Sequence, residues 1–171
     1  SEREDIIQNS REIINLSKRT IYAVQREDMK SASKLLKLME SNIKKLRSIN
    51  KNLDTNINKV AFQEYVEAIC FYEFMKSGKL ISYKKLEVSV EDYLMGICDL
   101  TGELVRKAVF DVINKKEKNA KQIKEFVSQI YLEFLKFTLR NGELRKKSDS
   151  IKWNLKKLEE IMYDLSIKSK K

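Results

Sequence analysis

The feature that most constrains the fold of this chain is its lack of helix breakers. Proline is absent, and glycine occurs only four times in 171 residues, at 78, 96, 102 and 142. Since these two residue types interrupt helices most strongly, long helices are expected. No β-branched run bounded by turn residues indicates a strand. The chain is therefore predicted to be all-α, a bundle of about six or seven helices that forms a single domain over residues 1–171.

Apolar residues at helical spacing predict where the first helices lie. Residues 2–48 are interpreted as one long amphipathic helix, or as two with a break near Glu27-Asp28. An Asn-rich loop follows over 49–57, with a plausible helix cap at Asp54 or Thr55. The next helix is expected over 58–76, and its nearly continuous apolar surface predicts a central place in the bundle.

Segments that interrupt helices divide the rest of the chain into further helices. Ser77-Gly78 ends the central helix, and a connector over 79–89 has room for one short helical turn. Ser89 is a candidate cap for a helix that runs to about Ile113. Two more helices are predicted over 120–139 and 143–167, separated by Asn141-Gly142 and preceded by a charged loop at 114–119, and residues 168–171 are expected to be loose.

The charge of the chain favours a polyanionic partner. With 35 Lys and Arg against 25 Asp and Glu, the formal net charge is +10. Nucleic acid is the common partner of so basic a surface, although a basic surface is also a solubility device or a thermophile trait. No apolar run is long enough to span a bilayer and no signal-peptide pattern is seen, so a soluble, cytoplasmic protein is expected. Cys70 and Cys98 fit buried thiols in a reducing compartment.

The absence of histidine removes whole classes of chemistry. It excludes the Ser-His-Asp triad, a His-dependent ribonuclease mechanism, zinc sites with His ligands and the Glu-x-x-His di-iron bundle. A cysteine nucleophile lacks the base that would activate it. Any catalysis must therefore use carboxylates, lysines, hydroxyls and a metal ion.

Four carboxylates occur in two apolar helical stretches. Glu64 and Glu67 are about 60° apart around the 58–76 helix, and Asp99 and Glu103 about 40° apart around the next one. Neighbouring like charges repel, and burying them among apolar groups is costly unless something positive lies between them. A divalent cation, Mg²⁺ or Mn²⁺, would meet that need because it prefers oxygen ligands.

The residues alone leave a second interpretation of these acids open. Structural ion pairs with Arg106 or with a lysine of another helix would also neutralise them. Gly96 and Gly102 are equally ambiguous, because tight helix packing explains a glycine as well as room for a substrate does. Glu73 lies about 180° from Glu64 and is interpreted as structural or as an interface charge. Asp92 is explained by its place in the first turn of a helix.

Several motifs resemble a known family. Gln63-Glu-Tyr-Val-Glu-Ala68, Leu80-Ile-Ser82 and Asp92-Tyr-Leu-Met-Gly-Ile-Cys-Asp-Leu-Thr-Gly-Glu-Leu-Val-Arg106 resemble TRAX, the translin-associated factor X, as does Ser17-Lys-Arg-Thr-Ile21. The final segment is more similar to translin itself, in Leu144-Arg-Lys-Lys147, Leu155-Lys-Lys-Leu-Glu-Glu160 and Tyr163-Asp-Leu-Ser-Ile167. The resemblance covers essentially the whole chain.

The resemblance implies a translin-fold domain that assembles into octamers around a cavity, here as a homo-oligomer of an archaeal type. TRAX subunits are metal-dependent endoribonucleases acting on single-stranded RNA, and the matching catalytic and metal-binding acids are Glu64, Glu67, Asp99 and Glu103. One acid would orient or deprotonate the attacking water. Translin proper lacks this acid set and mainly binds RNA or DNA, so a non-catalytic binding protein is the alternative, and a scaffold with a merely basic surface is a third.

Basic residues are harder to assign, since most surface lysines are simply solvated. Candidates for phosphate contacts are Lys18, Arg19, Arg106, Arg145, Lys146 and Lys147. Lysines between 115 and 124 would attract RNA without specificity, with strong salt dependence. Trp153 and the aromatic stripe at 126–137 are interpreted as packing or as a subunit interface.

Overall fold

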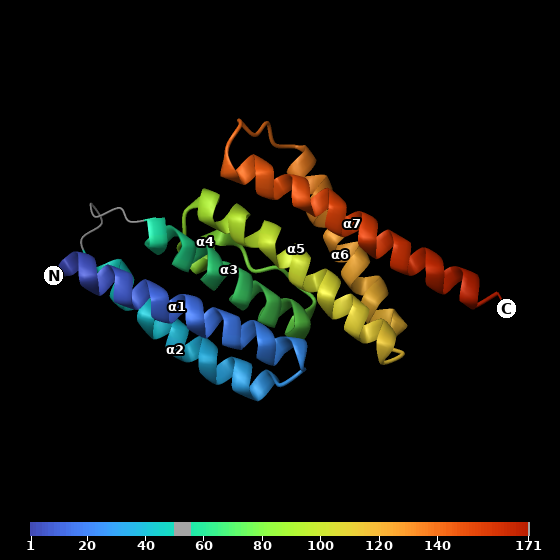
Figure 1. The fold of residues 1–171 in the computed structure, drawn as a ribbon, viewed down its shortest axis with the longest axis horizontal. Helices are drawn as coiled ribbons and strands as arrows, with labels where there is room; N and C mark the ends of the chain where they lie inside the picture. The colour runs from blue at the N-terminus through green and yellow to red at the C-terminus, as the bar shows by residue number, and fades with distance from the viewer. Residues whose placement is uncertain (50–55, 171) are drawn as a thin grey trace. The chain divides into compact units, whose positions relative to one another are not determined.

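The computed structural model describes residues 1–49 and 56–170, and these form seven helices without a strand. The predicted all-α class is therefore confirmed. The helices are α1 (Glu2–Gln25), α2 (Met29–Ser48), α3 (Asn56–Ser77), α4 (Tyr83–Leu86), α5 (Val90–Ile113), α6 (Glu117–Leu135) and α7 (Glu143–Lys168). Their order along the chain is seen in Figure 1.

Local signals set several helix ends where the sequence places them. The 2–48 segment is two helices, because Glu27 adopts a positive φ of 62° and Asp28 caps α2 by accepting a hydrogen bond from the Ser31 amide at 3.2 Å. Gly78, with φ +73°, ends α3. Ser89 Oγ accepts a hydrogen bond from the Asp92 amide at 3.1 Å, so the predicted cap of α5 is confirmed.

The bounds of two helices, α6 and α3, differ from the predicted ones. The helix expected over 120–139 starts at Glu117 and stops at Leu135. The last residue, Leu135, is 61% exposed, and Phe137 just after it is 48% exposed, so a longer helix would gain little packing. The α3 helix starts at Asn56 instead of 58, and the candidate caps Asp54 and Thr55 lie outside the described residues.

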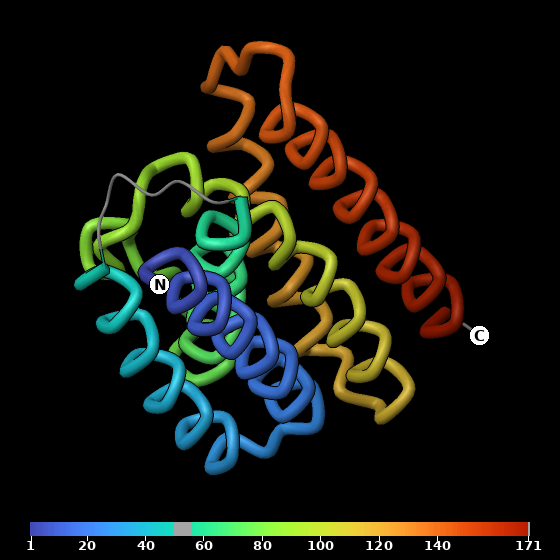
Figure 2. Tube along the Cα trace, turned by 60° about the vertical axis from the view of Figure 1, so that its left-hand side comes forward, coloured from blue at the N-terminus to red at the C-terminus, as the bar shows by residue number. Residues whose placement is uncertain are grey.

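The chain divides into two compact units, Ser1–Ile97 and Cys98–Lys171, with the boundary inside α5. In the first unit, α1 packs against both α2 and α3 (Figures 1 and 2). Every residue from Tyr65 to Phe71 of α3 is buried, which confirms the central place predicted for this helix within its unit. The Val66 side chain lies against Gly96 near the start of α5.

The second unit contains the rest of α5 with α6 and α7. The α7 helix runs back along α6, and the two pack together (Figures 1 and 2). Its core is made of apolar side chains from all three helices: Leu100, Leu104, Ala108, Ile123, Val127, Ile151 and Leu158. The prediction of a single domain over 1–171 stays a prediction. None of the helices in the described part of the chain is long and apolar enough to cross a membrane.

Candidate functional site

The four predicted acids lie on two helices that belong mainly to different units. Glu64 and Glu67 project from α3 in the first unit, whereas Asp99 and Glu103 project from α5 in the second. Glu67 is buried, with 7% of its surface exposed, and the other three are half-buried.

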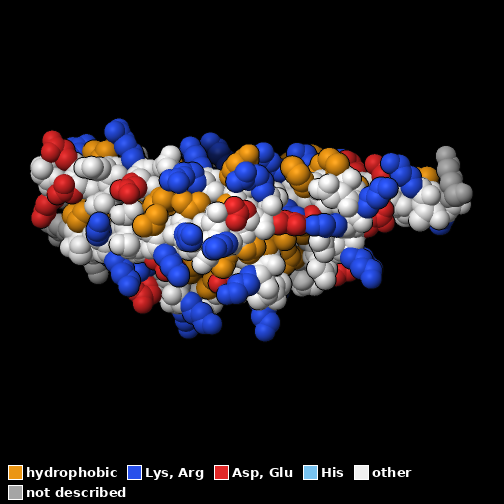
Figure 3. Space-filling model, turned by 90° about the horizontal axis from the view of Figure 1, so that it is seen from below, with side chains coloured by type: hydrophobic (Ala, Val, Ile, Leu, Met, Phe, Trp, Pro, Cys, Tyr) orange, Lys and Arg blue, Asp and Glu red, His pale blue; other side chains and the backbone are white. Residues whose placement is uncertain are grey.

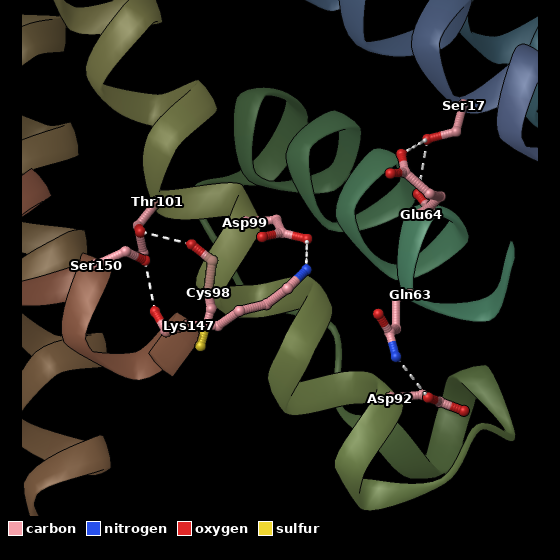
Figure 4. Close-up of polar contacts among 9 residues, drawn as sticks. All are labelled: Ser17, Gln63, Glu64, Asp92, Cys98, Asp99, Thr101, Lys147 and Ser150. Carbon is pink, nitrogen blue, oxygen red and sulfur yellow. Dashed lines mark hydrogen bonds and ion pairs between the residues drawn. The ribbon is translucent and has the colours of Figure 1, made fainter. Parts of the chain in front are cut away.

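A hydroxyl group from α1 contacts Glu64. Ser17 Oγ lies 2.8 Å from the backbone carbonyl oxygen of Glu64 and 3.3 Å from its carboxylate Oε2, and it can donate its proton to either (Figure 4). Ser17 itself is fully buried. The contact fixes α1 against α3 at the level of the acidic pair and gives the Glu64 carboxylate a hydrogen-bond donor. Ser17 lies in one of the motifs that resemble TRAX, but its contact with Glu64, 47 residues away, has no signal in the sequence.

Glu67 occupies a position that favours apolar side chains. Its neighbours in sequence, Val66 and Ala68, are fully buried, and Glu67 is the most deeply buried of the four acids. A carboxylate so placed is costly unless hydrogen bonds or a positive charge compensate for its lost hydration. Apolar packing alone therefore does not explain why a glutamate occupies position 67.

Asp99 forms an ion pair with a lysine of another helix. Lys147 Nζ on α7 lies 2.7 Å from Asp99 Oδ2 (Figure 4), and the two side chains are 31% and 32% exposed. The structural interpretation left open by the sequence, neutralisation by a lysine from another helix, thus holds for Asp99. Lys147 was predicted as a phosphate contact, and its partner could not be read from the sequence.

A polar contact sets the register of α5 and α7. Asn154 Nδ2 donates a hydrogen bond to Thr101 Oγ1 at 2.9 Å. Asn154 is seven residues, or about two helical turns, after Lys147, and Thr101 is two residues after Asp99. Thr101 is fully buried, so its hydrogen bond is well protected from water. This contact holds the backbone segments that place Lys147 beside Asp99.

The two glycines of α5 have different surroundings. A Cβ added at Gly96 would lie 2.6 Å from Val66 Cγ1 and 2.8 Å from the Gln63 carbonyl oxygen, so Gly96 is required by the close approach of α3 and α5. A Cβ at Gly102 would meet only Asn154 Nδ2, at an ordinary 3.8 Å. Packing therefore explains Gly96 but not Gly102, which lies beside the Asp99 and Glu103 pair.

A second ion pair lies further along α5. Lys107 Nζ contacts Asp111 Oδ1, and both side chains are only 2% exposed. Asp99, Glu103, Lys107 and Asp111 follow each other at intervals of four residues, so they lie along one slowly turning stripe of the helix. Lys107 and Asp111 were not predicted as part of the stripe, although their spacing of four residues is a signal that the sequence contains.

The two cysteines are unsuited to catalysis. Both are free and buried, and burial raises the pKa of each thiol to about 12. Such thiols remain protonated and unreactive at neutral pH. The predicted burial is confirmed. For Cys98 the nearby Asp99 carboxylate also raises the pKa, while Lys147 lowers it.

The carboxylate oxygens of these pairs are the type of ligand that a hard divalent cation prefers. Mg²⁺ is commonly bound by one or two carboxylates, with water and substrate phosphates completing its shell. Among residues 1–49 and 56–170, no group of three or more Asp, Glu or Cys side chains is placed to hold a metal ion. A site within one unit would therefore use a pair of acids and leave several positions for water or phosphate.

The sequence pattern of the Translin family matches residues 1–169. This chain belongs to the translin family. Translin of Gallus gallus is 38% identical over 81 residues, which are 47% of this chain and 35% of that protein. The Translin-associated protein X homolog of Schizosaccharomyces pombe is 29% identical over 187 residues, covering 94% of this chain and 79% of that protein. The chain thus spans 35% of the length of the chicken translin that it matches.

Solved structures support the same family. The crystal structure of apo-NeC3PO has a TM-score of 0.85 and 32% identity, covering 93% of this chain and 87% of that one. The AfC3PO complex with duplex RNA has a TM-score of 0.89 and 25% identity, covering 97% and 90%. The predicted translin-type fold and the resemblance to both translin and TRAX are confirmed for this translin-family chain.

The predicted basic contacts are exposed but untested. Lys18 and Arg19 lie on α1, Arg106 on α5, and Arg145 and Lys146 on α7, and all five are exposed. Arg145 also donates a hydrogen bond to Asn141 at 3.2 Å. On the face shown in Figure 3, Lys and Arg side chains are spread widely, with apolar patches between them. Such a spread of positive charge suits contact with a polyanion, while the contact of any single residue stays a prediction.

Proposed function

We propose that this translin-family chain is a divalent-metal-dependent endoribonuclease that cleaves single-stranded RNA within a homo-octameric shell. The observation that carries the proposal is the placement of two carboxylate pairs on α3 and α5 in a chain of net charge +10. Family membership supports nucleic-acid binding. A structural relative, AfC3PO, is known in complex with duplex RNA, which supports RNA as the ligand.

The residues have distinct roles in this proposal. A bound Mg²⁺ or Mn²⁺ would supply positive charge for water activation and for the phosphoryl oxygens. Glu64, Glu67, Asp99 and Glu103 are the acids from which its oxygen ligands would come, and the Ser17 hydroxyl orients the Glu64 carboxylate. An acid that does not ligate the metal accepts a proton from water. Exposed lysines and arginines hold the RNA backbone, so affinity falls with salt.

Self-association is supported by the surface of the second unit. Large apolar side chains on its three helices are between 41% and 71% exposed, more than an isolated unit needs to leave in water. They are Val109, Phe110 and Ile113 on α5, Leu132 and Leu135 on α6, and Trp153, Tyr163 and Ile167 on α7. Association of copies would remove this surface from water.

The test combines metal removal with one matched pair of variants. An unstructured RNA, and a duplex of the same sequence, are incubated with the protein in Mn²⁺ or Mg²⁺, then with EDTA. We expect single-strand cleavage that stops on chelation and returns with added metal. Glu67→Gln lowers the rate by about 100-fold or more, because even losing a group that supports a metal ligand costs about 10–100-fold. Glu73→Gln on the same helix keeps full activity.

Other outcomes select the alternatives. Cleavage that survives EDTA or Glu67→Gln contradicts the metal-dependent mechanism. RNA or DNA that is bound but uncut in Mn²⁺ identifies a non-catalytic, translin-like binding protein, which the Asp99–Lys147 ion pair favours because it neutralises an acid without metal. Absence of binding at low salt leaves a scaffold. Light scattering of the purified protein tests the octamer.

A further inference from the structure

We propose that Lys147 is the placeholder cation of the Asp99 site. Its ammonium group neutralises Asp99 when no dication is bound, and a dication displaces it toward an RNA phosphate. The inference rests on the proposed function, because it takes Asp99 as a metal ligand. Its starting point is the 2.7 Å ion pair between Lys147 Nζ and Asp99 Oδ2.

The ion pair is placed so that it can exchange. Each side chain is about one-third exposed, 31% for Lys147 and 32% for Asp99, so water competes for both charges. Partly exposed ion pairs are weak, since their Coulomb attraction is screened and ordering a long side chain costs entropy. A dication carries twice the charge of an ammonium group, so it can compete with this weak ion pair for the same oxygen.

The backbone on either side of the pair is fixed, which leaves the movement to the lysine side chain. Asn154 and Thr101 hold α7 against α5, and Ser150 Oγ donates a hydrogen bond to the Lys147 carbonyl (Figure 4). The four-carbon stem of lysine is flexible and carries its charge at the end. Displacement of Nζ from Asp99 can thus occur by rotamer changes of the lysine side chain, without movement of the backbone.

Charge repulsion gives the exchange its direction. A dication on Asp99 would repel an ammonium group a few ångströms away, and with water-like screening this corresponds to about a tenfold change in affinity. The ammonium would then turn outward, where Arg145 and Lys146 are exposed on the same turn of α7. Lysine is a common phosphate ligand, so an RNA phosphate is the anion that this position would meet.

Metal affinity without RNA is the first test. Mn²⁺ binding is titrated by the loss of the free-ion EPR signal for the wild type, Lys147→Met, Lys146→Met and Asp99→Asn. We expect Lys147→Met to bind Mn²⁺ about tenfold more tightly, because the competing charge is gone. The neighbouring control Lys146→Met stays at the wild-type affinity, and Asp99→Asn binds more weakly. Circular dichroism checks folding, and Lys147→Gln replaces the Met variant if that one is misfolded.

The outcomes separate this inference from the proposed function. Unchanged or weaker Mn²⁺ binding by Lys147→Met overturns the placeholder role while the Asp99 metal site stands. Unchanged binding by Asp99→Asn overturns the metal site itself, and the placeholder role with it. In steady-state cleavage, Lys147→Met is expected to raise KM for RNA with little change in kcat. An unchanged KM would overturn the transfer of Lys147 to phosphate.

Discussion

The two halves of α5 meet different demands although they form one helix. In the first half, Met95, Gly96 and Ile97 are buried, and Gly96 brings the helix backbone close to α3. The second half carries the charged stripe that begins at Asp99 and ends at the buried Asp111. Steric fit decides the residues of the first half, and charge compensation decides those of the second.

The same residue type shows the difference. Gly96 has no room for a methyl group, whereas Gly102 has ordinary space around it. A glycine in a helix interior costs about 1 kcal/mol relative to alanine. In the first half the close helix contact offsets that cost. In the second half no contact does, so the reason for Gly102 has to be sought in function.

Breaking the charge compensation of the second half is expected to have the largest effect. Lys107 is only 1% exposed. Asp111→Ala would remove the carboxylate that pairs with its ammonium group in the core of the unit. Loss of one partner from a buried ion pair typically costs about 3–5 kcal/mol. Urea unfolding followed by circular dichroism should show a decrease of that size in the free energy of unfolding.

A double variant is the control for this prediction. Replacing both partners with apolar residues, as in Lys107→Met with Asp111→Leu, removes the two charges together and is expected to restore most of the lost stability. If the single and double variants are equally unstable, the pair contributes through shape and not through charge, and the contrast between the two halves of α5 is wrong.

Filling the tight contact of the first half is expected to have the next largest effect. In Gly96→Ala the new methyl group would overlap the Val66 side chain and the Gln63 carbonyl, and the carbonyl belongs to backbone that cannot rotate away. Overpacking of this kind costs about 1–3 kcal/mol. The measurement is again urea unfolding. Val66→Ala combined with Gly96→Ala should recover part of the loss, and no recovery would place the strain at the carbonyl.

Local sequence signals were sufficient to predict most of the fold. Gly78, Ser89 and the Glu27-Asp28 break act within one turn of the helix ends that they determine, so they can be recognised without knowing the tertiary structure. The end of α6 could not be predicted in this way. It depends on whether Leu135 and Phe137 find a packing partner, and this is a property of the folded chain.

The candidate site was predictable in type but not in its partners. Carboxylate spacing and the family resemblance singled out Asp99, but the Lys147 that pairs with it is 48 residues away and is one of many lysines. Likewise, Ser17 and Glu64 are 47 residues apart. Such pairings depend on how the helices pack, and the spacing of residues along the sequence does not reveal them.

The smallest expected effect belongs to Gly102→Ala, which tests the functional half of the comparison directly. The added Cβ would lie 3.8 Å from Asn154 Nδ2, an ordinary contact, so the higher helix propensity of alanine should raise stability by about 1 kcal/mol or less. For a chain of this size that is an increase of about 2–4 °C in Tm by thermal unfolding. If the open space beside Asp99 and Glu103 receives the RNA backbone, the more stable variant will also have a lower kcat/KM for RNA. A variant that is stabilised and fully active would show that this space serves no substrate, and a destabilised variant would show that packing requires Gly102 as it requires Gly96.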